Sequence, residues 1–255
     1  MSLESPPPIY TLPLFPLHFV LFPQFPLQLQ VFEDRYHAMI SQCIEREQPF
    51  GVVLIAEGEE TGSPAVPHNV GCVARILAVK KLDDGRMNLL AIGEKRFRLL
   101  EYSEAEPPYL VGRVETLADR NCTEAELEKP LRDLHRLFRK YLRLLAECSG
   151  TVLPKLALPD DPTTLGFCIA AITQIPAMEK QRLLAMTDPH VRLKSEKRLL
   201  RQQIKELEIL KTSAEQTDPI EETDRIEEAG IRVTIAERLD TTREFWQTYL
   251  NNARN

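Results

Sequence analysis

Histidine, cysteine, serine and acidic side chains most often carry catalysis or bind metal ions, and here they are dispersed. The five histidines stand at positions 18, 37, 68, 135 and 190, and no two of them have the spacing of metal ligands. Ser41 follows His37 by about one helical turn, but no orienting acid and no oxyanion donors can be assigned to that pair. We therefore predict no catalytic residue, no metal site and no cofactor.

Cysteine usage and the lack of targeting segments indicate the compartment. The five cysteines, at positions 43, 72, 122, 148 and 168, include no C-x-x-C pair, so we predict unpaired thiols in a reducing environment. The opening MSLESPPPIY lacks the basic and apolar regions of a secretory signal. No run approaches the roughly 18 apolar residues of a membrane span. We expect a cytoplasmic protein without a membrane partner.

Charge argues against nucleic acid as the main partner. The net charge is −6, and phosphate contacts need clustered Lys and Arg. One such cluster is the basic face made by Arg132, Arg136, Arg139, Lys140 and Arg143. Its default interpretation is a solvated helix face, and the alternative is a surface for nucleic acid or for an acidic partner.

Residues 12–36 read LPLFPLHFVLFPQFPLQLQVFEDRY and organise the first part of the chain. Prolines 13, 16, 23 and 26 lack an N–H, so we expect them to limit the strands to short pieces at 10–14, 19–22 and 27–31. In the last piece, apolar residues alternate with glutamines, which is the period of a strand. A helix over 33–47 is predicted to follow, with one apolar stripe.

The pattern after this helix predicts more strands. They cover 50–55, 70–82, 87–92, 97–102 and 109–116, with a tight turn at 83–86 and a bulge or corner at 93–96. Six or more short strands with one helix and no βαβ alternation predict a closed or nearly closed small barrel over residues 9–118.

From residue 121 the apolar period becomes helical. A capping box at Thr123–Glu126 opens a long helix, and further helices are expected from 162, 176 and 189. Short connections predict an antiparallel bundle over 121–213, so the fold class is α+β. Residues 214–255 turn acidic. We expect a partly helical extension that lies against the last basic helix or stays loose.

Several motifs of the barrel segment resemble the N-terminal, substrate-receiving domain of Lon protease, and still more the bacterial proteins that carry this domain alone. They are LPLFPL at 12–17, VLFP at 20–23, VFEDRY at 31–36, FGVV at 50–53, VGCVARI at 70–76, LDDGR at 82–86 and GEKRF at 93–97. The helical part is similar to the segment that follows in Lon, through PAMEKQRLL from Pro176. The resemblance implies a PUA-like β-barrel followed by a helical bundle.

The resemblance also implies a function. Within these 255 residues there is no G-x-x-x-x-G-K-[ST] phosphate loop, no G-x-S-x-G elbow and no H-E-x-x-H, so the ATPase and Ser–Lys peptidase parts of Lon are not expected. We expect a non-catalytic module that binds unfolded or exposed apolar polypeptide segments and works with a separate protease or chaperone. An RNA-binding PUA-like protein and a small-molecule-binding barrel are the alternatives.

The candidate peptide-binding residues are Phe19, Leu21, Phe22, Phe25, Glu33, Arg35, Tyr36 and Arg96. The four apolar ones form either an exposed strip or part of the barrel core, and Phe25 is expected to be the most exposed. Glu33, Arg35 and Tyr36 form either a polar site with Arg75 or Arg96, or a helix N-terminus with a structural ion pair.

Overall fold

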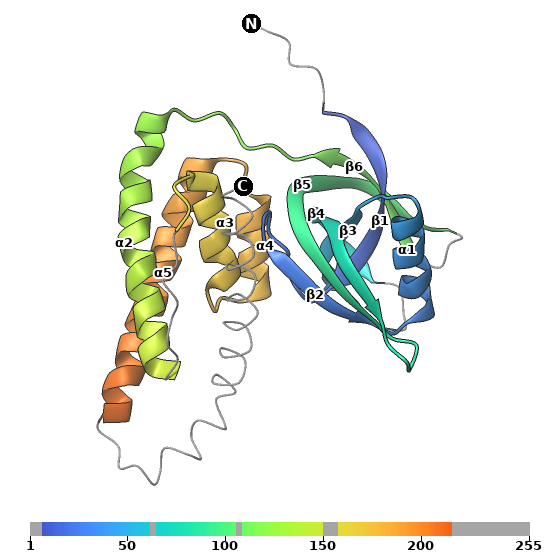
Figure 1. Ribbon diagram of the computed structural model, residues 1–255. Helices are drawn as coiled ribbons and strands as arrows, with labels where there is room; N and C mark the ends of the chain where they lie inside the picture. The colour runs from blue at the N-terminus through green and yellow to red at the C-terminus, as the bar shows by residue number, and fades with distance from the viewer. Residues whose placement is uncertain (1–6, 62–64, 106–108, 150–157, 216–255) are drawn as a thin grey trace, which may run out of the picture. The chain divides into compact units, whose positions relative to one another are not determined.

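A computed structural model describes residues 7–61, 65–105, 109–149 and 158–215, which form six strands and five helices (Figure 1). The strands are β1 (Ile9–Leu17), β2 (Pro26–Val31), β3 (Phe50–Glu57), β4 (Val66–Lys81), β5 (Met87–Ala105) and β6 (Tyr109–Thr116). The helices are α1 (Asp34–Glu45), α2 (Glu124–Ser149), α3 (Pro162–Ile172), α4 (Ala177–Ala185) and α5 (Pro189–Glu215).

The chain divides into two compact units. The first combines Met1–Cys122 with Thr163–Arg192, and the second combines Thr123–Pro162 with Leu193–Asn255. The sheet therefore shares its unit with α4 and nearly all of α3, whereas the sequence suggested one bundle of four helices. The acidic extension expected over 214–255 lies outside the described residues from position 216 onward.

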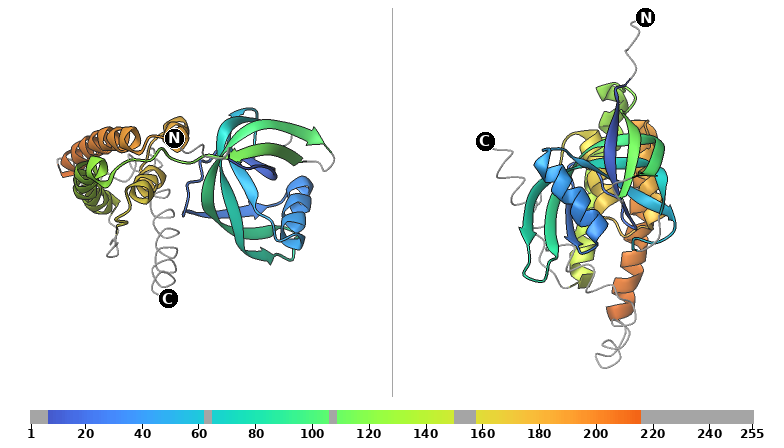
Figure 2. Two further views of the ribbon diagram at one scale, coloured as in Figure 1. Left: turned by 90° about the horizontal axis from the view of Figure 1, so that it is seen from above. Right: turned by 90° about the vertical axis from the view of Figure 1, so that its right-hand side faces the viewer.

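The six strands form one mixed sheet in the order β2-β5-β4-β3-β1-β6, and β5 also pairs with β6. This last pairing closes a ring through β5, β4, β3, β1 and β6, whose strands curve back on themselves in Figure 2. β2 stands outside the ring, beside the first part of β5, and β1 runs parallel to β3. The simple barrel that we expected is thus corrected to a mixed sheet with an added edge strand.

β1 shows that its prolines do not cut it short, contrary to expectation. It runs unbroken through Pro13 and Pro16. Residues 9–14 pair with β6 and residues 14–17 pair with β3, so each proline lies where β1 has one partner strand only. A proline is tolerated where its missing N–H faces the unpaired side. The strand predicted at 19–22 is wrong, because these residues lie in the loop between β1 and β2.

The hairpin predicted around 83–86 is confirmed. Gly85 adopts a φ of 87°, and the Leu82 N–H donates to the Arg86 carbonyl at 2.8 Å. The bulge predicted at 93–96 is confirmed as well, because the β4–β5 register shifts between Cys72 and Ala74, which face Arg96 and Gly93.

Gly93 holds the loop between β1 and β2 in place. Its N–H donates to the Phe25 carbonyl at 2.9 Å, and its carbonyl accepts from the Gln24 N–H at 2.7 Å. A Cβ at this position would overlap the carbonyl oxygen of Phe22, which is backbone and cannot rotate away. The absence of a side chain on Gly93 is therefore what lets the loop lie against β5.

The core of the first unit has two clusters. One joins the apolar stripe of α1 to the sheet: Tyr36, Met39, Ile40 and Cys43 are buried as predicted, whereas Ile44, which was expected to extend the stripe, is 45% exposed. The other lies among the strands of the ring and consists of Leu12, Leu14, Val53, Val73, Phe97, Leu99, Leu110 and Val114.

In the second unit, α2 and α5 run side by side and parallel, as Figure 1 shows. Three ion pairs join them in rising order along both helices: Asp133 with Lys197, Lys140 with Glu208 at 2.6 Å, and Glu147 with Lys211 at 3.0 Å. The predicted antiparallel arrangement does not hold for this pair. Two further helices separate them in the sequence, so short connections do not set their relative direction.

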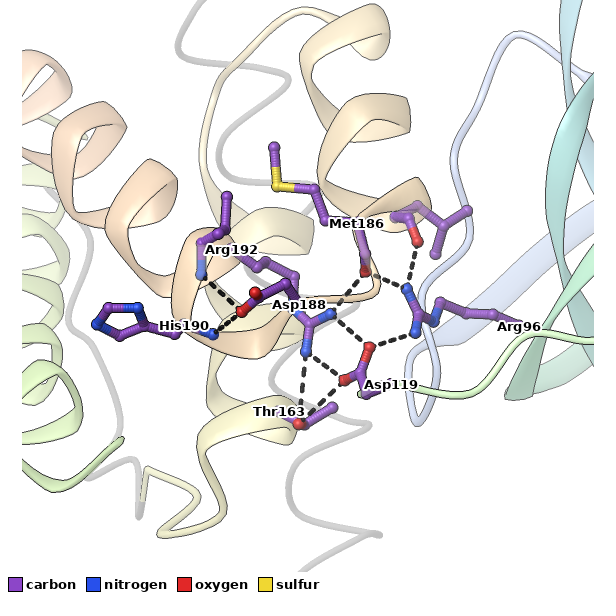
Figure 3. A network of polar contacts seen from close by, with 9 residues as sticks. Arg96, Asp119, Thr163, Met186, Asp188, His190 and Arg192 are labelled. Atoms are coloured by element: carbon purple, nitrogen blue, oxygen red, sulfur yellow. Dashed lines mark hydrogen bonds and ion pairs between the residues drawn. The ribbon is translucent and has the colours of Figure 1, made fainter. Parts of the chain in front are cut away.

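A buried ion cluster in the first unit centres on Asp119, which lies between two arginines (Figure 3). Its carboxylate accepts a hydrogen bond from Arg96, and two from Arg192 at 2.9 and 2.6 Å. Arg96 also donates to the backbone carbonyls of Leu184 at 2.7 Å and Met186 at 2.6 Å. The cluster therefore ties β5 to the end of α4 and to the start of α5.

Both guanidinium groups of this cluster also face one aromatic ring. The Cζ atoms of Arg96 and Arg192 lie 5.3 and 4.5 Å from the centroid of the Phe167 ring on α3. The Thr163 hydroxyl, at the start of α3, donates to Asp119 at 3.3 Å. The side chain of Arg192 is 0% exposed. Burial of two positive charges makes the single carboxylate indispensable.

The titration of Asp119 follows from these contacts. Burial alone would raise the pKa of its carboxyl, but the hydrogen bonds and charge of Arg192, together with those of Arg96, lower that pKa below its ordinary value. A lowered native pKa means that the carboxylate stabilises the fold above pH of about 4, and that this contribution is lost as the pH falls further.

We expect Asp119→Asn to lower the free energy of unfolding at neutral pH by about 3–5 kcal/mol, because it removes the carboxylate that pairs with both buried guanidiniums. The difference from wild type should shrink as the pH falls below about 4, because protonation of the unfolded chain progressively removes the stabilisation that the wild-type carboxylate provides. Urea unfolding across this pH range measures both effects.

Asp84→Asn is the control, because Asp84 pairs with Arg86 on the exposed hairpin turn. Its unfolding midpoint should stay close to wild type at each pH. An equal loss in the two variants would contradict a special role for the buried cluster.

We expect Gly93→Ala to lower the free energy of unfolding by about 2–3 kcal/mol, because the new methyl group forces the Phe22 backbone away. Gly85→Ala should cost about 1 kcal/mol, since the positive φ of Gly85 disfavours a side chain but nothing lies near the added methyl. Urea unfolding of both variants measures the difference, and a smaller loss in Gly93→Ala would contradict the close contact.

Candidate functional site

The structure separates the predicted apolar strip into core and surface. Leu21 and Phe22 are 1% and 0% exposed, so both belong to the core. The Phe22 ring lies 5.8 Å from the Phe167 ring of α3, measured between centroids. Neither residue offers a surface to a partner, and the alternative interpretation as barrel core applies to them.

Of the other two phenylalanines of the strip, Phe19 and not Phe25 is the more exposed, contrary to expectation. Phe25 is half-buried and packs against the core cluster around α1. Phe19 is 38% exposed. The reason lies in the turn before β2: Gln24 adopts a φ of 63°, and the Phe25 N–H donates back to the Phe22 carbonyl at 3.2 Å. The turn directs the Phe25 side chain onto the core.

Glu33, Arg35 and Tyr36 do come together at the start of α1, and we refer to these three residues as the polar group. The Arg35 Nε donates to the Glu33 carboxylate at 3.0 Å, and the Arg35 Cζ lies 4.7 Å from the centroid of the Tyr36 ring. Arg35 also donates to the backbone carbonyl of Glu60 at 3.1 Å. Glu33 occupies the position before the first helical residue, which suits a negative charge.

The arginines suggested as companions of this polar group lie elsewhere. Arg75 pairs with Glu94 at 2.6 Å on the exposed face of β4 and β5, and Arg96 belongs to the Asp119 cluster. The interpretation that fits Glu33 and Arg35 is therefore a structural ion pair at a helix N-terminus.

Tyr36 is buried beneath the ion pair and has no role as an acid or base. Its ring stacks on Phe15 with a centroid distance of 4.1 Å. Burial raises the pKa of the Tyr36 phenol above its ordinary value, and the charge of Arg35 offsets only part of that rise. The phenol therefore stays protonated at neutral pH.

Two further segments meet this polar group. The His18 N–H donates to the Glu60 carboxylate, and the His18 imidazole lies 3.6 Å from the Glu59 carboxylate. These contacts tie the beginning of the β1–β2 loop to the segment after β3. Phe19 is the next residue after His18, so its backbone is held at the edge of the polar group.

Phe32 is an exposed aromatic residue that the sequence interpretation missed. It is 59% exposed and lies between β2 and Glu33. The signal was present: Leu27 and Val31 are buried in the strand, so the alternation of side chains directs residue 32 outward. Phe19, in the β1–β2 loop, and Phe32, after β2, thus both lie next to the polar group.

β2 presents an open edge next to these aromatic residues. Among the described residues it pairs with β5 only. The bond from the Gly93 N–H to the Phe25 carbonyl fixes the alternation, so Leu27 and Leu29 direct their backbone groups toward β5. The backbone groups of Gln28 and Gln30 therefore face the open edge. An open edge of this kind can accept an added strand.

The chemistry available at this surface is apolar contact and backbone hydrogen bonding. Within the parts of the chain that the structure describes, no three His, Cys, Asp or Glu side chains gather as a metal-binding group. Burial raises the pKa of the Cys43 thiol to about 11, so it is not a nucleophile at neutral pH. All five cysteines are free thiols, as predicted.

Over the same described ranges, no helix combines the length and the apolar character that crossing a membrane requires.

Comparison with solved structures places the fold. The Lon N-terminal domain protein from Xanthomonas campestris matches with a TM-score of 0.55 at 28% identity, over 72% of this chain and 95% of that one. The N-terminal domain of the Mycobacterium avium complex Lon protease matches with a TM-score of 0.56, over 75% of this chain and 98% of that one. Its identity is 16%, so this second match supports the fold alone.

Sequence comparison agrees with these structures. The Lon protease of Anaeromyxobacter dehalogenans is 32% identical over 205 residues, which are 79% of this chain and 24% of that protein. The chain thus spans about a quarter of the length of this relative. The model of the substrate-binding domain of ATP-dependent protease La (LON) matches residues 11–202, and the resemblance noted in the sequence is confirmed. The chain belongs to the family of LON substrate-binding domains.

Proposed function

We propose that this chain is a non-catalytic module that binds unfolded or exposed apolar segments of polypeptides. The observation that supports it most is the combination of two exposed aromatic residues, Phe19 and Phe32, with the open edge of β2. Membership of the LON substrate-binding family supports a role in recognising protein substrates.

The binding mechanism combines two weak sources of free energy. An extended segment pairs with the backbone groups of Gln28 and Gln30, and each hydrogen bond contributes about 0.5–1.5 kcal/mol. Its apolar side chains cover Phe19 and Phe32, and burying one such ring contributes about 1.5–3 kcal/mol. Association itself costs at least about 4 kcal/mol, so the net affinity is modest and release is fast. Such binding suits a protein that samples many substrates.

The polar group positions this surface and does not contact the substrate. Arg35 holds Glu33 and the Glu60 backbone, and His18 holds Glu60 from the other side. The backbones next to Phe19 and Phe32 are therefore fixed before a substrate arrives, which lowers the entropy cost of binding.

The setting of this activity completes the proposal. The module has the mixed sheet as its framework, acts in the cytoplasm, and passes bound segments to a separate protease or chaperone. Phe19, Phe32 and β2 form the contact surface, and Phe25 supports it from the core side.

We expect the variant Phe19→Ser with Phe32→Ser to bind an unfolded polypeptide at least about tenfold more weakly, because two apolar contacts are lost. The probe is fluorescently labelled, reduced and carboxymethylated α-lactalbumin, and fluorescence anisotropy measures its dissociation constant.

The control replaces two exposed apolar residues elsewhere on the same sheet, Leu100→Ser with Tyr102→Ser. It should bind as wild type does. Equal weakening in both double variants, or none in the first while its urea midpoint is unchanged, would refute this surface.

We expect Gln28→Pro to weaken binding of the same probe by roughly threefold to tenfold, because it removes one backbone donor from the open edge. The β2–β5 pairing should survive, since the Gln28 N–H points away from β5. Urea unfolding checks this point.

Gln28→Ala is the matched control, because it removes the same side chain and keeps the N–H. If the alanine variant weakens binding as much as the proline variant, strand addition at this edge is wrong.

A further inference from the structure

A row of arginines follows one face of α2 in the second unit. Arg132, Arg136, Arg139 and Arg143 stand at steps of four, three and four, which keeps them on one side of a helix. All four are exposed. Arg132 pairs loosely with Glu128 at 3.5 Å, and Arg136 with Asp133 at 3.7 Å.

This arginine row is more than a solvated helix face, because it lines a hollow. The four arginines line an open cavity on the surface, of about 500 Å³, together with Leu131, His135 and Asp160. Among the lining residues that the structure describes, Asp160 is the one carboxylate, against four guanidinium groups. The cavity therefore carries a clear positive charge and has room for several acidic side chains.

The chain itself contains a segment of the opposite charge. Residues 216–228 read QTDPIEETDRIEE, with six acidic residues and one basic residue. This segment follows α5 directly. The pair between Lys211 and Glu147, at 3.0 Å, brings the last turns of α5 beside the last turns of α2. The acidic segment thus starts at the end of α2 that lies nearest Arg143.

The length of the segment suffices to cover the row. The eleven steps from Arg132 to Arg143 correspond to about 17 Å of helix. Thirteen extended residues can span up to about 43 Å, so the segment can turn back and still follow the whole row. Because the two partners belong to one chain, their effective concentration is on the order of millimolar.

We propose that the arginine row of α2 binds the acidic segment 216–228 of the same chain. Carboxylates of the segment enter the cavity and pair with Arg139 and Arg143, which have no ion pair among the described residues. The overall charge of −6 makes a nucleic acid a poorer occupant.

Hydrogen–deuterium exchange of the full chain, read by mass spectrometry, tests the proposal. In wild type, amides of residues 216–228 should exchange more slowly than in a synthetic peptide of the same sequence. The variant Arg139→Glu with Arg143→Glu should exchange there about fivefold faster or more, because two attractive contacts become repulsive. Combining it with Glu221→Arg and Glu222→Arg should restore the slow exchange.

The matched control is Arg198→Glu with Arg201→Glu, two exposed arginines on α5. Exchange of 216–228 should remain within about twofold of wild type, because only general attraction is altered. An equal effect in this control overturns the proposal, and so does a wild-type segment that exchanges as fast as the free peptide. If an oligouridylate protects α2 in that second case, the row is a nucleic-acid surface instead.

Discussion

The carboxylate of Asp119, held between Arg96 and Arg192, is the contact on which the first unit depends. Moving two guanidiniums out of water costs several kcal/mol each, and a single carboxylate offsets this only with help. The help comes from the Leu184 and Met186 carbonyls and from the face of the Phe167 ring. Each of these groups lies on a different helix or loop, so the charges align the helices with the sheet.

One short stretch of β5 connects this cluster to the proposed binding surface. The Gly93 backbone forms hydrogen bonds with the loop that carries Phe19. Arg96 binds Asp119 in the ion cluster, and Phe97 packs in the core of the ring. The bulge between residues 93 and 96 lets neighbouring residues of β5 point toward the loop, the ion cluster and the core. The motif GEKRF therefore has a physical meaning: it joins loop, helices and core at one point of the sheet.

The candidate site shows where interpretation of the sequence failed. One of the two interpretations grouped Arg96 with Glu33, but strand periodicity does not reveal which carboxylate an arginine will meet. Phe25 was expected at the surface because polar and proline residues flank it, yet the left-handed turn at Gln24 directs it inward. Phe32 was predictable from the alternation along β2 and was overlooked.

Local patterns in the sequence determined most elements: the α1 stripe, the hairpin turn around Gly85, the bulge after Gly93 and the capping box of Thr123, whose hydroxyl and N–H both bond Glu126. These depend on neighbours within a few residues, which a sequence displays. Only the tertiary structure decided that the proline-rich β1 is one strand between two partners, that α2 and α5 run parallel, and that Asp119 joins two arginines. Each of these depends on segments that meet only when the chain has folded, and periodicity carries no information about such meetings.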